Sequence, residues 1–225
     1  NGEQGMEQAL NSIPDIIVSD IMMPVMNGIT MCKILKEDVR TSHIPIILLT
    51  AKDSLQDKEE GYQVGADSYL TKPFSATLLH SRINNLLESR KRLTERFNTS
   101  TPHHNMDEKR ALLAESLNKL DNEFIEKINQ LIEARLSSEK IDIGYLADNM
   151  CMSKSTLYRK MKALTGLSTN EYVRKIKMQH AERLLLEGRY NISEVAFRVG
   201  INSVVYFRQC FKEEFGVLPS EYLKQ

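Results

Sequence analysis

The chain has 225 residues, a mass of 25.8 kDa and a formal net charge of zero, and 41% of its residues are hydrophobic. This length favours two domains of roughly 100 residues each. No apolar run approaches the roughly 20 residues that cross a bilayer, and three widely spaced cysteines fit neither a disulfide framework nor a zinc motif. We therefore expect a cytoplasmic protein with reduced thiols.

The net charge of zero hides an uneven distribution. Residues 154–212 contain 12 Lys and Arg against four Asp and Glu, a net charge of +8. Such a segment is most often a solvated surface, but it also fits a polyanionic partner such as nucleic acid. The fold that carries these charges decides between the two interpretations.

In the first half of the chain, short apolar runs alternate with segments of helical periodicity. We expect strands over residues 15–20, 44–50 and 68–72, and helices over residues 30–36, 54–64 and 76–92. Strands rich in Ile, Leu and Val that alternate with helices predict an α/β domain with a parallel sheet buried on both faces.

The second half of the chain has a different pattern. Residues 98–105, with the sequence NTSTPHHN, break every periodicity, and the residues after Met106 are helical throughout. We therefore expect an α/β domain over residues 1–97, a linker and connecting helix over 98–120, and an all-α domain over 121–225.

The all-α half contains two copies of one unit. Residues 143–150 parallel residues 192–199 at an offset of 49, and the matches that follow continue at an offset of 50. Each copy has a short helix, a tight turn and a second helix that opens at Ser153 or Ser203. Serine is a favoured N-cap, so the pattern predicts two helix-turn-helix units.

Apolar residues on one side of each second helix predict which side chains face outward. The outward set is Lys154, Ser155, Tyr158, Arg159 and Lys162 in the first copy, and Val205, Arg208, Gln209 and Lys212 in the second. These residue types contact base edges and phosphates in the major groove. A helix over residues 169–188 would span about 30 Å, close to one turn of DNA. The alternative is a helical bundle with solvated basic faces.

Residues 121–225 resemble the AraC-type DNA-binding domain. The resemblance is carried by both helix-turn-helix units, the long segment between them and the stretch NISEVAFRVGINSVVYFRQCFKEEFGVLPSEYL. It implies a transcription regulator that binds double-stranded promoter DNA and contacts RNA polymerase.

Three expected strands of the first half end in polar residues. Asp20 closes the run IIVSD, Thr50 closes IPIILLT, and Lys72 follows SYLT. The carboxyl ends of parallel strands meet at one edge of a sheet, where α/β folds place their chemistry. A carboxylate, a hydroxyl and an ammonium at that edge suit the transfer of a phosphoryl group to the carboxylate. Each residue alone could instead cap a helix.

The first half resembles the response-regulator receiver domain, a flavodoxin-like fold, through DxxMPxMNG, LLTA and GADSYLTKPF. The resemblance implies that Asp20 is the phospho-acceptor, Thr50 the switch hydroxyl, Lys72 the phosphate-binding lysine and Tyr69 the switch aromatic. It makes the backbone carbonyl of Met22 a magnesium ligand. It also implies a histidine kinase as partner and a homodimer formed through the receiver.

The sequence also departs from the receiver pattern. The family's first strand, which ends in paired acids that bind Mg²⁺, and the helix and strand that follow it do not occur in the 225 residues. Asp20 and the Met22 carbonyl are too few ligands for an ion that demands six oxygens. We expect Mg²⁺ in a complete receiver and weak binding here, with the missing part outside this sequence or on another chain.

Three functions are consistent with these features. The leading one is a transcription regulator controlled by aspartyl phosphorylation, free-standing or at the cytoplasmic C-terminal end of a hybrid histidine kinase in the membrane. The second is a phosphorylation-independent DNA-binding protein whose receiver only dimerises. The third is a phosphatase with Asp20 as nucleophile, which ranks last because Met22 stands where such enzymes have a second Asp. We therefore expect no enzyme activity from this chain itself.

Overall fold

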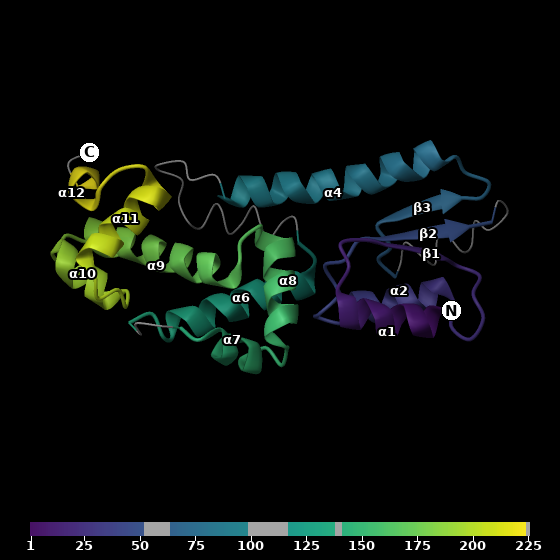
Figure 1. The fold of residues 1–225 in the computed structure, drawn as a ribbon, viewed down its shortest axis with the longest axis horizontal. Helices are drawn as coiled ribbons and strands as arrows, with labels where there is room; N and C mark the ends of the chain where they lie inside the picture. Colours follow the sequence, from purple (N-terminus) through teal and green to yellow (C-terminus); the bar gives the residue numbers. More distant parts are fainter. Residues whose placement is uncertain (52–63, 99–116, 138–140, 224–225) are drawn as a thin grey trace. The chain divides into compact units, whose positions relative to one another are not determined.

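The computed structural model describes all residues except 52–63, 99–116, 138–140 and 224–225 (Figure 1). The chain forms two compact units, the first of which contains Asn1–Arg96 together with Leu117–Asp121. The second unit includes the residues from Asn122 onward. Most of the linker expected over residues 98–120, and nearly all of the helix expected over 54–64, lie outside the described residues. None of the described helices combines the length and the apolar character needed to cross a membrane.

Within the described residues, the sheet of the first unit has three parallel strands in the order β1 (Ile17–Asp20), β2 (Ile46–Thr50) and β3 (Ser68–Thr71). This confirms the predicted parallel sheet. The central strand β2 begins two residues later than expected, because Pro45 has no N–H to donate to the ladder. In the register, Asp20 pairs with Leu49 and Thr71 pairs with Thr50, so the strand ends meet at one edge.

Helices cover both faces of this sheet. Figure 1 shows α1 (Gly2–Ser12) and α2 (Gly28–Glu37) on one face and α4 (Ala76–Asn98) on the other. Sequence reasoning missed α1, whose start is a capping box: the Asn1 side chain accepts from the Gln4 N–H at 3.0 Å, and the Gln4 side chain bonds back to Asn1.

The core of the first unit lies between the sheet and the helices α1 and α2. Its fully buried members are Cys32 and Leu35 from α2 and Ile46 and Leu48 from β2. Burial raises the pKa of the Cys32 thiol to about 11, so this cysteine stays protonated at neutral pH. This packing holds α2, and therefore the turn before it, against the end of β1.

The second unit is helical throughout its described residues, as predicted. Its helices are α6 (Lys119–Glu133, of which the first three residues belong to the first unit), α7 (Ile143–Asn149), α8 (Lys154–Thr165), α9 (Thr169–Leu186), α10 (Ile192–Arg198), α11 (Val204–Phe215) and α12 (Pro219–Tyr222). Helices α7 and α8 form one helix-turn-helix unit and α10 and α11 form the other. Helix α9 packs against α8, α10 and α11.

The two second helices of these units are built alike. The side chains of Ser153 and Ser203 cap α8 and α11 by accepting from backbone N–H groups of the first turn. Each helix ends at a glycine in the left-handed conformation, Gly166 with φ 73° and Gly216 with φ 78°. The repeat seen in the sequence is therefore a repeat of helix length and of both caps.

Candidate functional site

The carboxylate of Asp20 lies at the end of β1, where two groups bind it. The Lys72 ammonium donates a hydrogen bond to Oδ2, and the Met22 N–H donates to Oδ1 at 3.3 Å. The bond from Lys72 is the main cause of a lowered Asp20 pKa. The Asp20 side chain is 36% exposed, so the carboxylate is charged at neutral pH and open to a reactant from solvent.

Thr50, on β2, and Tyr69, on β3, lie in the same sheet as Asp20. Thr50 is 1% exposed, and its hydroxyl donates to the carbonyl of Ala51 at 3.2 Å. The carbonyl of Thr50 accepts from the Lys72 N–H at 2.8 Å, which ties the ends of β2 and β3 together. The ring of Tyr69 is half-buried and packs against the core. The peptide bond between Lys72 and Pro73 is cis.

Receivers generally use Mg²⁺, an ion that the groups at this edge of the sheet would have to bind through oxygen atoms. In the described part of the chain, no group of three or more His, Cys, Asp and Glu side chains could hold a metal. Asp20 contributes one carboxylate, and the Met22 carbonyl could add one oxygen. Magnesium demands near-octahedral coordination by six oxygens. The described residues therefore do not form a complete magnesium site.

Gly28, the first residue of α2, lets this helix lie close to the end of β1. Its N–H donates to the carbonyl of Ile21 at 2.9 Å, and a Cβ at this position would lie 2.2 Å from the carbonyl oxygen of Asp20. The Asn27 side chain caps α2 at the same place. Only glycine allows α2 to approach the end of β1 this closely.

Helix α8 presents the first expected DNA-reading face. Leu157, Met161 and Leu164 are buried, as the periodicity predicts. All five residues expected to face outward are exposed: Lys154, Ser155, Tyr158, Arg159 and Lys162. The side of α8 that the core leaves free is therefore basic and rich in hydrogen-bond donors.

Helix α11 presents the second face. Phe207 and Phe211 are fully buried, and the Phe211 ring packs edge-on against Tyr222 at 5.6 Å between centroids. All four residues expected to face outward are exposed: Val205, Arg208, Gln209 and Lys212. The Gln209 amide donates to Glu213 at 3.1 Å.

Some of the basic residues between 154 and 212 do not face solvent. Lys160 is buried with its ammonium 4.9 Å from the centre of the Phe124 ring. Lys175 is buried and pairs with Glu214 at 3.3 Å, and Lys177 donates to the Gly200 carbonyl at 3.2 Å. The +8 counted in the sequence therefore overstates the surface charge, because part of it stabilises the helix packing.

Comparison with known proteins identifies both halves of the chain. A model of the response regulator receiver domain matches residues 1–84, and a model of a helix-turn-helix domain matches residues 146–225. The chain is a receiver domain joined to an AraC-type helix-turn-helix domain. This confirms the resemblances drawn from the sequence.

Individual relatives match this receiver and AraC-type pair over different lengths. Histidine kinase P4 from Formosa agariphila is 35% identical over 222 residues, which is 99% of this chain and 16% of the relative. The DNA-binding dual master transcriptional regulator RpaA from Synechocystis is 40% identical over 95 residues, 42% of this chain and 39% of that relative. The chain thus spans less than half of the length of either curated relative.

Among solved structures, the C-terminal domain of AraT, a response regulator from Geobacillus stearothermophilus, is 31% identical to this chain. The likeness covers 45% of this chain and 84% of that one, with a TM-score of 0.42.

The two domains that the family models identify, a receiver and an AraC-type domain, together fit a response-regulator transcription factor of a two-component system.

Proposed function

We propose that this protein regulates transcription by binding promoter DNA under the control of phosphorylation at Asp20. The observation that carries the proposal is the Asp20 carboxylate, exposed and ion-paired with Lys72, in a chain whose α8 and α11 both present basic outer faces. One half supplies an acceptor for a phosphoryl group, and the other supplies two surfaces that suit the major groove.

The chemistry at Asp20 would be a simple displacement. An oxygen of the Asp20 carboxylate attacks the phosphorus of a phosphohistidine, a P–O bond forms, the P–N bond breaks, and the histidine nitrogen takes a proton. Lys72 already bonds that carboxylate and is placed to pair with the phosphoryl oxygens once they arrive. The Thr50 hydroxyl, which now donates to Ala51, is the group that we expect to turn toward them.

The donor histidine is proposed to belong to the same polypeptide. Histidine kinase P4 is similar to 99% of this chain over only 16% of its own length. We infer a hybrid protein in which a kinase precedes the receiver. Residues outside this sequence, or on a partner chain, would then supply the acids that complete the magnesium site.

On the DNA side, we propose that Arg159 and Arg208 read base edges and that Lys154, Lys162 and Lys212 hold phosphates. Helix α9 lies between the two helix-turn-helix units in the chain and, with 18 residues, is about 27 Å long. This length is close to one turn of DNA, so we propose that α8 and α11 enter successive major grooves on one face of the DNA. Contact with RNA polymerase and pairing of receivers into a homodimer, in the cytoplasm, complete the proposed function.

The test combines labelling with DNA binding. A target sequence is selected from a random DNA pool, and its affinity is measured with and without acetyl phosphate and Mg²⁺. In a longer protein that includes the missing magnesium-binding acids, radiolabelled acetyl phosphate should label Asp20, so Asp20→Asn should remove the label and Asp15→Asn, at an exposed acid on the approach to β1, should keep it. Label that survives Asp20→Asn contradicts the assignment of the acceptor.

The same titration tests the alternative function. A receiver that only dimerises predicts a DNA affinity that acetyl phosphate does not change even when Asp20 is fully labelled. The regulatory proposal predicts a change in affinity that follows the degree of labelling and that is lost in Asp20→Asn.

A further inference from the structure

On α11, the outward-facing Gln209 is held by the carboxylate of Glu213, which lies one turn further along the same helix. The Gln209 Nε2 donates to Oε1 of Glu213 at 3.1 Å, and the guanidinium of Arg174, on α9, pairs with Oε2 at 3.4 Å. Each oxygen of the carboxylate thus has its own partner. We call Gln209, Glu213 and Arg174 the Gln209 bridge, and all three residues belong to the second unit.

The Glu213 carboxylate decides which way round the Gln209 amide is held. An ionised carboxylate only accepts hydrogen bonds, whereas an amide has an NH₂ donor on one side and a carbonyl acceptor on the other. Turned the other way, the amide would set its Oε1 against a carboxylate oxygen. The NH₂ group therefore faces Glu213. This contact leaves Oε1 and the second hydrogen of Nε2 for a ligand.

Helix α9 holds this part of α11 by two neighbouring ion pairs. Arg174 pairs with Glu213, and the next residue, Lys175, pairs with Glu214 at 3.3 Å. Two successive acids of α11 are thus matched by two successive cations of α9. Arg174 and Glu213 are 44% and 49% exposed, so water weakens their attraction in the free protein. The pair becomes stronger when bound DNA excludes that water.

A carboxylate on a DNA-facing helix does not help affinity. Glu213 directly follows Lys212, one of the residues expected to hold phosphates, and a negative charge there repels the DNA backbone. Arg174 offsets that charge. What Glu213 adds to DNA recognition is therefore the orientation of the Gln209 amide, which bears on the choice of base.

We propose that Glu213, held by Arg174, orients Gln209 to read an adenine in the major groove. The proposal rests on the DNA binding proposed above. Adenine presents a donor at N6 and an acceptor at N7, and the oriented amide offers the acceptor Oε1 and one N–H donor. Guanine presents two acceptors, O6 and N7, so Oε1 would face another acceptor.

The test measures DNA affinity by fluorescence anisotropy. The chain selects a target from a random pool, and each base pair of that target is then exchanged in turn. Gln209→Ala locates the base pair that Gln209 reads. Glu213→Gln preserves the size of the side chain, but its amide both donates and accepts, so it permits either orientation of Gln209. Glu126→Gln, which removes an exposed acid of α6, is the matched control.

At the base pair that Gln209 reads, the wild type and Glu126→Gln should prefer adenine over guanine roughly tenfold, and Glu213→Gln should lower this preference to about twofold. Glu213→Gln should nevertheless bind DNA at least as tightly as the wild type, because it removes a negative charge beside the phosphates. A damaged fold would weaken binding to every sequence. The combination of lower preference and undiminished affinity therefore separates orientation from a structural role.

Two further measurements test the parts of the Gln209 bridge. Purine without the N6 amino group, in place of the adenine, should bind the wild type roughly tenfold more weakly than adenine and should bind Gln209→Ala as well as adenine does. Arg174→Met keeps the bond between Gln209 and Glu213 but removes the cation. It should weaken binding to all sequences severalfold, with a smaller loss of preference than Glu213→Gln.

Two outcomes overturn the proposal. One is a target in which Gln209→Ala removes no preference for adenine at any base pair, and the other is a Glu213→Gln variant that prefers adenine as strongly as the wild type. Failure to select any DNA sequence would instead refute the proposed function, so the two failures are distinguishable.

Discussion

The Lys72 ammonium donates a hydrogen bond to the Asp20 carboxylate, although 52 positions separate the two residues in the chain. The contact arises because β1 and β3 are parallel to the strand between them, so that their carboxyl ends share one edge of the sheet. An ammonium bound to the carboxylate keeps it charged, which is the state in which it can act as a nucleophile.

This ion pair predicts how the protein responds to acid. Lys72 lowers the pKa of Asp20 in the folded state, so the pair stabilises the fold above the unfolded-state pKa of about 4. That stability is lost as the pH falls through the lower folded-state pKa. Lys72→Met should raise the Asp20 pKa and weaken this acid dependence, as measured by NMR titration and by urea unfolding at several pH values.

Lys33→Met is the control for this prediction, because Lys33 is an exposed lysine on α2. Lys33→Met should leave the pKa of Asp20 unchanged from the wild type. The gain from the pair itself is small, since Lys72 and Asp20 are 44% and 36% exposed and water screens their attraction. An Asp20 pKa that is equal in the two variants would exclude Lys72 as the cause of the shift.

Gly28 should be among the least replaceable residues near Asp20. An added Cβ would lie 2.2 Å from the Asp20 carbonyl oxygen, so Gly28→Ala forces the backbone of α2 or β1 to move. We expect a loss of roughly 2–4 kcal/mol in the free energy of unfolding. Gly5→Ala is the control, because its Cβ would meet the side-chain sulfur of Met31, at 3.0 Å, and no backbone atom outside α1. Equal losses in urea unfolding would contradict this role.

The exposed arginines of α8 and α11 should decide DNA affinity. Arg159→Ala and Arg208→Ala should each weaken binding to the selected DNA by about 1–3 kcal/mol and relax the preference for one base position. Arg189→Ala removes an exposed arginine outside the reading helices and should have little effect. If fluorescence anisotropy shows all three variants binding like the wild type, the assignment of the reading faces is wrong.

The buried pair of Lys175 and Glu214 should respond unequally to the loss of either charge. Glu214→Gln leaves the Lys175 ammonium, which is 5% exposed, facing a neutral group and should cost about 3 kcal/mol of stability. Lys175→Met places an apolar chain in the same space and should cost much less stability. The side chain of Glu214 is the more exposed of the two, so its carboxylate keeps contact with water after its partner is removed. Urea unfolding of both variants measures the difference, and a larger loss for Lys175→Met would contradict it.

Periodicity and local motifs were sufficient for much of the fold. Alternating apolar runs predicted the parallel sheet, and the repeat of a serine cap followed by an apolar stripe predicted the two helix-turn-helix units. These features depend on residues close together in the chain, whose spacing alone determines which side of a helix is apolar. The outward residues of α8 and α11 were predicted for the same reason. The assignments of Thr50, Tyr69 and the Met22 carbonyl remain predictions.

Other features depend on contacts between distant segments. Composition counted Lys160, Lys175 and Lys177 as part of a basic surface, and only the packing of α9 and its neighbours showed that they are buried. The helix α1 escaped notice, although its Asn1 and Gln4 form a recognisable capping box.

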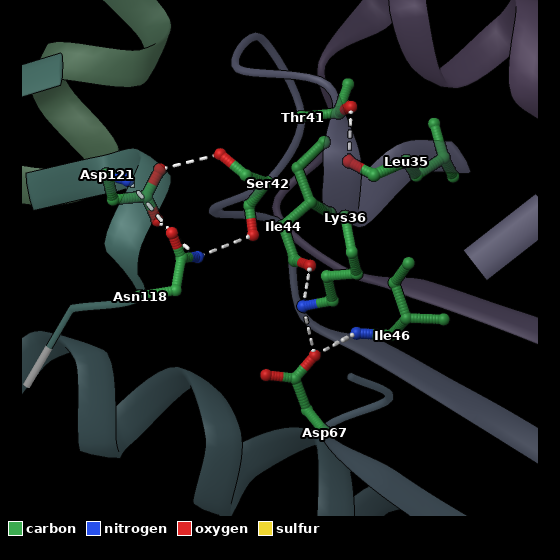
Figure 2. Close-up of polar contacts among 9 residues, drawn as sticks. All are labelled: Leu35, Lys36, Thr41, Ser42, Ile44, Ile46, Asp67, Asn118 and Asp121. Carbon is green, nitrogen blue, oxygen red and sulfur yellow. Dashed lines mark hydrogen bonds and ion pairs between the residues drawn. The ribbon is translucent and has the colours of Figure 1, made fainter. Parts of the chain in front are cut away.

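The sequence by itself determined the two domain types and the outward sides of α8 and α11, because each is encoded by a local pattern of residue types. The roles of Asp20 as acceptor and of these two helices in reading DNA stay predictions. Only the tertiary structure decided that Lys72 binds Asp20, that Gly28 must lack a side chain and that Ser42 binds Asp121 (Figure 2). Ser42 and Asp121 are 79 positions apart, and neither belongs to a motif. Their pairing follows from burial, which leaves each polar group no partner except another one brought to it by the fold.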